Sequence, residues 1–192
     1  MDTLLAIDFQ ILDWIQLLRT GWLDAFMAAV THLGDSGIIW IITGLVLCLK
    51  KNLRPYGLMV LAALVCGLLI GNLGIKPLVA RLRPFQIREG IELLIRAPGE
   101  YSFPSGHTLS SFEAAFVLLY MDRRAGAAAL TLASVIAFSR LYLYVHFPTD
   151  VLGGILLAAL IALAVTQAAR RVFGIVPIKN REAENMRQIR KG

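Results

Sequence analysis

The chain has 192 residues, 57% of which are hydrophobic, and its mean hydropathy is +0.68. A soluble domain of this length carries more polar surface, so the composition excludes an ordinary water-soluble enzyme and indicates a helical membrane protein. The net charge of +6 is then best explained by where basic residues lie relative to the membrane, and we expect no nucleic-acid partner. Both cysteines, Cys48 and Cys66, lie in apolar segments, so no disulfide is expected.

The sequence divides into three parts. Residues 1–21 are predicted to form an amphipathic helix in the membrane interface, because apolar residues recur at helical spacing from Leu4 to Leu18 while Asp13 falls elsewhere on the wheel. Residues 22–170 are predicted to form the membrane domain, and residues 171–192 a basic cytoplasmic tail.

Six apolar segments are candidates for membrane-spanning helices. In chain order they are residues 22–33, 38–49, 56–75, 107–121, 125–144 and 151–169. The Gly34–Gly37 segment is predicted to be a turn between the first two. The predicted fold is therefore all-α, a six-helix transmembrane bundle preceded by the interfacial helix.

Basic residues predict the orientation of this bundle. With six crossings, three basic clusters fall on one side; they are Lys50-Lys51-Arg54, Arg123-Arg124 and Arg170-Arg171. The positive-inside rule makes that side cytoplasmic and places both termini there. We therefore expect a multi-pass protein of the cell membrane whose 77–103 segment faces outside. That outer segment itself carries four arginines, which the topology does not explain.

Three polar segments are predicted to meet on the outer face. They are Lys76 to Arg83-Pro84, the turn Phe103-Pro104-Ser105-Gly106-His107, and Ser139-Arg140 through His146 to Asp150. Pro104 cannot lie inside a helix and Ser105 is a good N-cap, so a helix is predicted to begin there. Its free N–H groups and positive dipole end favour an anion, and Gly106 permits close approach to the backbone.

Each of these residues has an ordinary structural explanation when taken alone, such as a helix cap or a lysine that reaches for the interface. Together they match the needs of phosphoryl transfer. Two arginines and a lysine can neutralise a phosphate, and two histidines can supply a nucleophile and a proton donor. A carboxylate four residues after His146 can fix its tautomer. Carboxylate clusters typical of Mg²⁺ or Ca²⁺ sites and a third zinc ligand are lacking, so neither a metal nor a cofactor is expected.

The three segments resemble the signature of the type-2 phosphatidic acid phosphatase superfamily, which reads Lys-x6-Arg-Pro, Pro-Ser-Gly-His and Ser-Arg-x5-His-x3-Asp. The resemblance covers about residues 20–170 and implies a six-helix membrane bundle with its active site near the membrane surface. It implies that His146 is the nucleophile that forms a phosphohistidine, that Asp150 orients it, and that His107 is the general acid. It also implies a phosphate-binding set of Lys76, Arg83, Ser105, Gly106 and Arg140.

The predicted substrate is a lipid phosphate or diphosphate presented at the outer surface. An undecaprenyl-type (polyprenyl) diphosphate fits first, while phosphatidylglycerophosphate, phosphatidate and diacylglycerol diphosphate stay open. An alternative of another class is a non-catalytic protein that binds or moves an anionic lipid. Glu113 lies outside the signature, six residues after His107, and we expect it to contact a polar group on a neighbouring helix, such as Asn72 or His32. The alternative is that Glu113 holds a residue of the pocket or meets the lipid headgroup.

Overall fold

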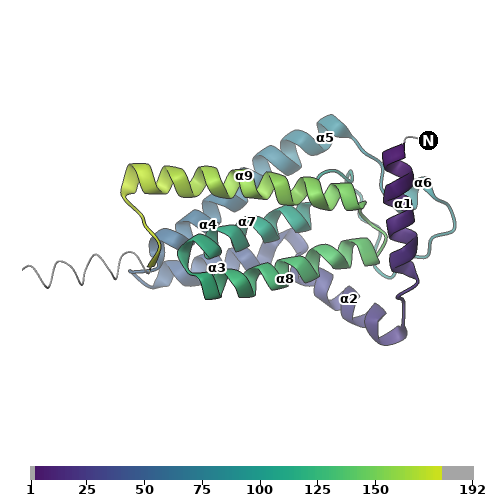
Figure 1. Ribbon diagram of the computed structural model, residues 1–192, viewed down its shortest axis with the longest axis horizontal. Helices are drawn as coiled ribbons and strands as arrows, with labels where there is room; N and C mark the ends of the chain where they lie inside the picture. The colour runs from purple at the N-terminus through teal and green to yellow at the C-terminus, as the bar shows by residue number, and fades with distance from the viewer. Residues whose placement is uncertain (1–2, 179–192) are drawn as a thin grey trace, which may run out of the picture.

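The computed structural model describes residues 3–178, and within that range every regular element is helical (Figure 1). The elements are α1 (Thr3–Gln16), α2 (Gly21–Leu33), η1 (Asp35–Gly37), α3 (Ile38–Leu49), α4 (Arg54–Gly67), η2 (Leu68–Ile75), α5 (Lys76–Val79), α6 (Pro84–Ile87), α7 (Gly106–Met121), α8 (Arg123–Tyr142) and α9 (Pro148–Phe173). The η1 element is a 3-10 turn and η2 is a π-helix. Residues 179–192, most of the predicted basic tail, lie outside the described range.

Helix α7 forms the centre of the bundle and packs against α4, α8 and α9. Most of its residues are buried, and Ala114 and Ala115 are fully buried, because small side chains let neighbouring helices approach closely. Helix α8 approaches closely at Gly126, where an added Cβ would lie 2.2 Å from the Cα atom of Leu119. The predicted helix beginning at the 103–107 turn is thus the element on which the others pack.

Three helical units are long and apolar enough to cross a membrane among the described residues. They are Arg54–Ile87, which joins α4, η2, α5 and α6, then α8 and α9. Helix α2 and the η1–α3 segment add a fourth if they count together as one span. The six predicted crossings are therefore not confirmed.

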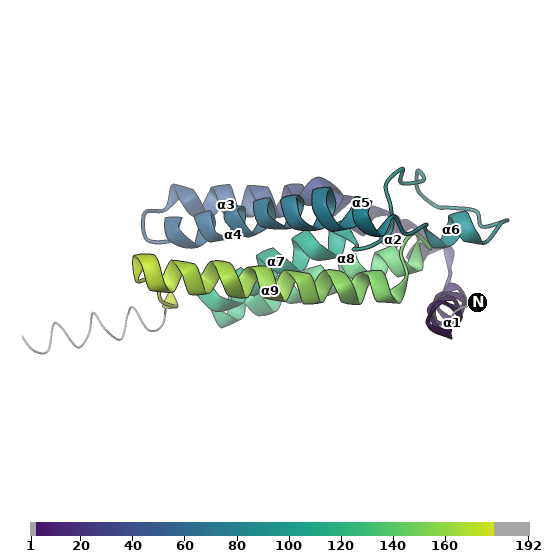
Figure 2. The same cartoon turned by 90° about the horizontal axis from the view of Figure 1, so that it is seen from above.

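The Gly34–Gly37 segment does not reverse the chain as predicted. Helices α2 and α3 are bent by 43° at this break, and Figure 2 shows α3 beside α4 while α2 continues toward the end of the bundle where α6 lies. The prediction treated Gly-Asp-Ser-Gly as an ordinary turn between antiparallel helices. Two residues in it, Ser36 (φ 51°) and Gly37 (φ 66°), adopt left-handed backbone that breaks the helix without reversing its direction.

Helix α1 lies across one end of the bundle, roughly perpendicular to the long helices, and α9 ends at the other end (Figures 1 and 2). The bend at η1 removes one reversal of the chain, so the predicted placement of both termini on one side of the membrane is not confirmed. On α1, the exposed apolar side chains include Leu4, Ile7 and Trp14, while Asp8 and Leu12 are buried against the bundle. The buried face attaches the helix to the end of the bundle, and its predicted place in the membrane interface is not confirmed.

Candidate active site

The three signature segments meet at the end of the bundle that α1 covers. Each is held by a helix end: Lys76 begins α5, Arg83 precedes α6, and Gly106 begins α7. The third segment links α8 to α9, and Asp150 lies in the first turn of α9, where its carboxylate accepts the backbone N–H of Phe147 at 2.8 Å. Helix ends thus place the polar side chains of separate segments side by side.

A cavity of about 1000 Å³ opens between these helix ends. The predicted site residues that line it are Lys76, Arg83, Gly106, His107, Arg140 and His146. Away from them the lining is mostly apolar and includes Ile41, Leu61, Leu64, Val65 and Leu68, with Glu113 beside Gly67. Ser105 and Asp150 are not among the lining residues, and both are fully buried. The cavity therefore has a cationic end and an apolar end, which suits a ligand with an anionic headgroup and a hydrocarbon tail.

The His146 imidazole is held from both sides and is 1% exposed. On one side, Nδ1 lies 3.5 Å from Asp150 Oδ2 and 3.4 Å from the Ser102 hydroxyl, which itself donates to Asp150 at 2.5 Å. On the other side, a guanidinium nitrogen of Arg83 lies 3.0 Å from Nε2. A guanidinium can only donate, so Nε2 carries the lone pair and Nδ1 the proton.

The electrostatic surroundings keep this ring neutral. Burial lowers the pKa of His146 well below its usual range, and the nearby Arg83 and Arg140 guanidiniums act in the same direction, while Asp150 offsets them only in part. A neutral imidazole with its lone pair on Nε2 is the form that can attack phosphorus once substrate displaces the Arg83 hydrogen bond.

Four cations line the cavity. Arg96 is exposed, whereas Lys76, Arg83 and Arg140 are each at most 5% exposed. Lys76 donates to the Glu100 carboxylate at 2.7 Å, which lowers the pKa of that carboxyl. Arg83 also donates to the carbonyls of Glu100 (2.7 Å) and Val145 (2.8 Å). Arg140 donates to the Thr31 hydroxyl, and its buried Nε atom has no hydrogen-bond partner among the described residues. Buried cations with unused donors are suited to an anion such as phosphate.

His107 also lines the cavity, and its partner was not predicted. Its Nε2 atom lies 2.9 Å from Asp35 Oδ1, and the other Asp35 oxygen lies 2.8 Å from His32 Nδ1. Asp35 belongs to the Gly34–Gly37 segment, which the sequence showed only as a turn. No spacing rule could connect it to His107, because the two are 72 positions apart.

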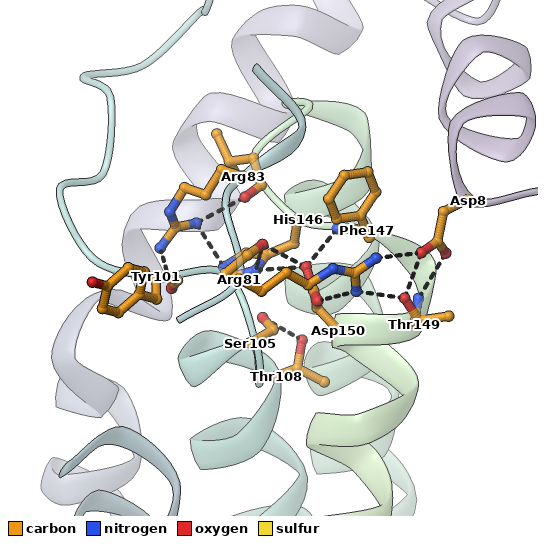
Figure 3. Close-up of polar contacts among 12 residues, drawn as sticks. Asp8, Arg81, Arg83, Tyr101, Ser105, Thr108, His146, Phe147, Thr149 and Asp150 are labelled. Carbon is orange, nitrogen blue, oxygen red and sulfur yellow. Dashed lines mark hydrogen bonds and ion pairs between the residues drawn. The ribbon is translucent and has the colours of Figure 1, made fainter. Parts of the chain in front are cut away.

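Arg81 is a second residue that the prediction missed, since it falls in the variable stretch of the first signature segment. Its guanidinium donates to Asp150 Oδ1 at 2.6 Å and to Asp8 Oδ2 at 2.7 Å, and it stacks over the Phe147 ring at 4.2 Å (Figure 3). Asp8 also accepts the backbone N–H of Thr149 at 3.1 Å and its hydroxyl at 2.5 Å. Helix α1 is thereby joined to the residue that contacts His146.

Two predicted details differ from the structure. Ser105 occupies the N-cap position of α7, but its side chain makes no capping bond; its hydroxyl accepts instead from Thr108 at 2.9 Å. Glu113 is fully buried, and neither carboxylate oxygen has a hydrogen-bond partner among residues 3–178, so the expected contact with Asn72 or His32 is wrong. The carboxylate lies instead against Gly67 of α4, where an added Cβ would be 2.2 Å from Oε1.

Within the described part of the chain, groups of three or more His, Cys, Asp or Glu side chains suited to hold a metal ion are not found.

Comparison with known proteins agrees with this arrangement. Residues 53–173 match the model of the PAP2 superfamily. The chain is 29% identical over 160 residues to the undecaprenyl-diphosphatase of Sulfolobus acidocaldarius, covering 83% of this chain and 75% of that protein. It is 30% identical over 161 residues to phosphatidylglycerophosphatase B of Bacillus subtilis, covering 76% and 74%.

A solved structure supports the same relationship. The crystal structure of a transmembrane PAP2 type phosphatidylglycerolphosphate phosphatase from Bacillus subtilis aligns with a TM-score of 0.74 at 26% identity, over 90% of this chain and 89% of that one. The family match extends over more than half of the chain and includes every predicted site residue from Lys76 to Asp150. The chain belongs to the PAP2 superfamily.

Proposed function

We propose that this protein is a membrane lipid phosphatase that removes a phosphate from a lipid phosphate or diphosphate through a phosphohistidine on His146. The observation that carries the proposal is the state of this ring. It is buried and neutral, its Nε2 lone pair faces Arg83 at 3.0 Å, and it lines a cavity shared with Lys76, Arg140 and His107. A non-catalytic lipid-binding protein would need the cations but not a held, neutral imidazole.

The chemistry proceeds in two displacements. First, His146 Nε2 attacks phosphorus, the P–O bond to the lipid breaks, and protonated His107 gives its proton to the leaving oxygen. Then water attacks the phosphohistidine, neutral His107 takes the water proton, and the P–N bond breaks to release inorganic phosphate. Lys76, Arg83 and Arg140 stabilise the charge that develops on the equatorial oxygens in both steps, so we propose that no metal is required.

The substrate we propose first is an undecaprenyl-type (polyprenyl) diphosphate. The apolar end of the cavity suits a long hydrocarbon tail, and the undecaprenyl-diphosphatase of Sulfolobus acidocaldarius is similar over most of this chain. Phosphatidylglycerophosphate is the second candidate, because the Bacillus subtilis phosphatase with a TM-score of 0.74 bears that substrate in its name.

We further propose that the site end of the bundle faces outside the cytoplasm. The clusters at Lys50–Arg54, Arg123–Arg124 and Arg170–Arg171 lie at helix ends away from the cavity, and basic loops favour the cytoplasmic side. In this arrangement α2 and α3 cross the membrane once as a bent unit, and α4–α5, α7, α8 and α9 cross once each. Because the number of crossings is odd and α9 ends on the cytoplasmic side, helix α1 lies on the outer surface. Its exposed apolar side chains then enter the interface.

A phosphate-release assay in detergent tests the activity. Purified protein is given undecaprenyl diphosphate, phosphatidylglycerophosphate, phosphatidate and diacylglycerol diphosphate in separate reactions, and His146→Ala serves as the matched control. We expect release from at least one lipid by the wild type and none above background by the variant. Equal release by both proteins, or no release from any of the four lipids, would contradict the proposed function.

A further inference from the structure

Asp35 lies between two histidines at the edge of the cavity. Its Oδ1 atom is 2.9 Å from His107 Nε2 and its Oδ2 atom is 2.8 Å from His32 Nδ1. The His32 side chain is 65% exposed and His107 19%, so the three residues lead from solvent to the cavity wall. All three lie on separate elements, α2, η1 and α7, and two of them precede the segment that matches the family.

The backbone around Asp35 is built for this contact. At Gly34 an added Cβ would lie 2.7 Å from His107 Cδ2 and 2.8 Å from Ile136, so only glycine allows the chain to pass this close to the ring. Ser36 holds a left-handed conformation (φ 51°) that is costly for a residue with a side chain. The break between α2 and α3 therefore places one carboxylate against His107.

The charges around His107 show why a carboxylate is needed there. Arg140 from α8 and Lys76 from α5 both oppose a positive charge on the ring, whereas Asp35 from η1 favours it. Glu100, from the loop before α7, is the other acidic group that interacts electrostatically with the ring, and its carboxylate is bonded to Lys76. Asp35 is the carboxylate bonded to the imidazole itself.

We infer that Asp35 is a positioning residue for His107: its carboxylate accepts from Nε2, fixes the ring, and leaves Nδ1 for the leaving oxygen of the substrate. The inference rests on the proposed function, in which His107 is the general acid. Asp35 then orients the general acid His107, as Asp150 orients the nucleophile His146. His32 holds the outer oxygen of Asp35 from an exposed position, so its loss has the smaller effect.

Two substrates that differ only in their leaving group test the inference. Farnesyl monophosphate and farnesyl diphosphate share a tail, but the first releases an alcohol, which must be protonated, and the second releases a phosphate monoester, which needs little protonation. Asp35→Asn removes a charge-assisted hydrogen bond, so we expect kcat to fall on the order of 10- to 100-fold for the monophosphate. For the diphosphate we expect a loss of about threefold or less. The high-pH limb of the monophosphate profile should move to lower pH, because the ring then loses its proton more readily.

Three further variants separate positioning from a general structural role. Asp35→Glu keeps the charge and should restore part of the rate. Asp122→Asn, at the other end of the bundle, removes a carboxylate that caps α8 but leaves an amide that caps equally well, and should leave both rates unchanged. In a His107→Ala background, Asp35→Asn should cost nothing more, because two residues that act through one group are not additive.

The outcomes are distinct. A wild type that releases phosphate from neither probe contradicts the proposed function itself. An active wild type whose Asp35→Asn variant loses the same factor on both substrates, and loses it again in the His107→Ala background, overturns the inference alone. If Asp35→Asn does not purify as a folded protein, Asp35→Ser carries the same expectations and the same refutation.

Discussion

Helix α1 contributes a buried carboxylate, Asp8, to the site end of the bundle. The Asp8→Asn variant measures how much its contacts contribute to stability and to kcat. The Asp8 carboxylate is 2% exposed and accepts three hydrogen bonds, from the Thr149 N–H, the Thr149 hydroxyl and the Arg81 guanidinium. An asparagine keeps one acceptor oxygen and turns an NH₂ group toward one of these donors. Arg81 still donates to Asp150, so its charge keeps a carboxylate partner.

The expected loss follows from these contacts. A hydrogen bond to a charged group contributes about 1.5–3 kcal/mol, and one such bond is lost outright, so we expect about 2 kcal/mol of destabilisation. Because Arg81 also holds the Asp150 carboxylate that faces His146, we expect a fall in kcat of roughly tenfold, equivalent to about 1.4 kcal/mol. Thermal unfolding in detergent and phosphate release measure the two effects separately.

Asp13→Asn is the matched control on the same helix. Asp13 pairs with Arg88 and accepts a hydrogen bond from Tyr144, but its side chain is 48% exposed, and exposed ion pairs contribute about 0–1 kcal/mol. We expect little change in rate and a small change in stability. If Asp8→Asn behaves like Asp13→Asn in both measurements, α1 does not support the site and the reasoning is refuted.

Four other predictions follow from the same structure. Activity should persist in EDTA and be inhibited by vanadate, because vanadate adopts the five-coordinate geometry that the cations stabilise. Activity that disappears in EDTA and returns with Mg²⁺ would show a metal requirement. Glu89→Cys, in a background lacking Cys48 and Cys66, should react in intact cells with a membrane-impermeant reagent, whereas labelling only after lysis would reverse the orientation. Glu113→Gln should keep most of the activity. Glu113→Leu should not lower the melting temperature, because it removes a buried carboxylate that has no hydrogen-bond partner among the described residues. A Gln variant that folds but loses over 100-fold in rate would show that Glu113 belongs to the active site. Because the pKa of His146 is lowered and the ring acts in its deprotonated form, kcat should hold as the pH falls through 6.5 and drop only well below it; a rate already halved near pH 6.5 would contradict the neutral, buried nucleophile.

The sequence predicted those parts of the molecule that depend on local pattern. The helix that begins at Gly106 was expected from Pro104 and Ser105, and α8 and α9 lie close to their expected positions. The signature residues were predicted as one site because their spacing is characteristic, and six of them line one cavity.

The rest depended on contacts between distant positions. Two 12- to 13-residue apolar segments joined by Gly-Asp-Ser-Gly are compatible with either a hairpin or a bent span, and tertiary packing selects the bend. Asp8, Asp35 and Arg81 have ordinary surroundings in the sequence, so only the fold shows that they contact Asp150 and His107. A buried carboxylate such as Glu113 suggests a partner on general grounds, but the sequence cannot show that the neighbour is a glycine.

A covalent phosphohistidine at His146 is the central step of the proposed mechanism, and trapping it is the most direct test. Wild-type protein and the variants His146→Ala and His107→Ala are mixed with undecaprenyl diphosphate labelled in the terminal phosphate, quenched in alkali within milliseconds to seconds, and analysed for bound label. A phosphohistidine survives alkali and is lost in acid. We predict transient label on the wild type, none on His146→Ala, and label that persists longer on His107→Ala, because the group that activates water is missing. Turnover by the wild type without any bound label, or equal label on His146→Ala, would contradict the proposed mechanism.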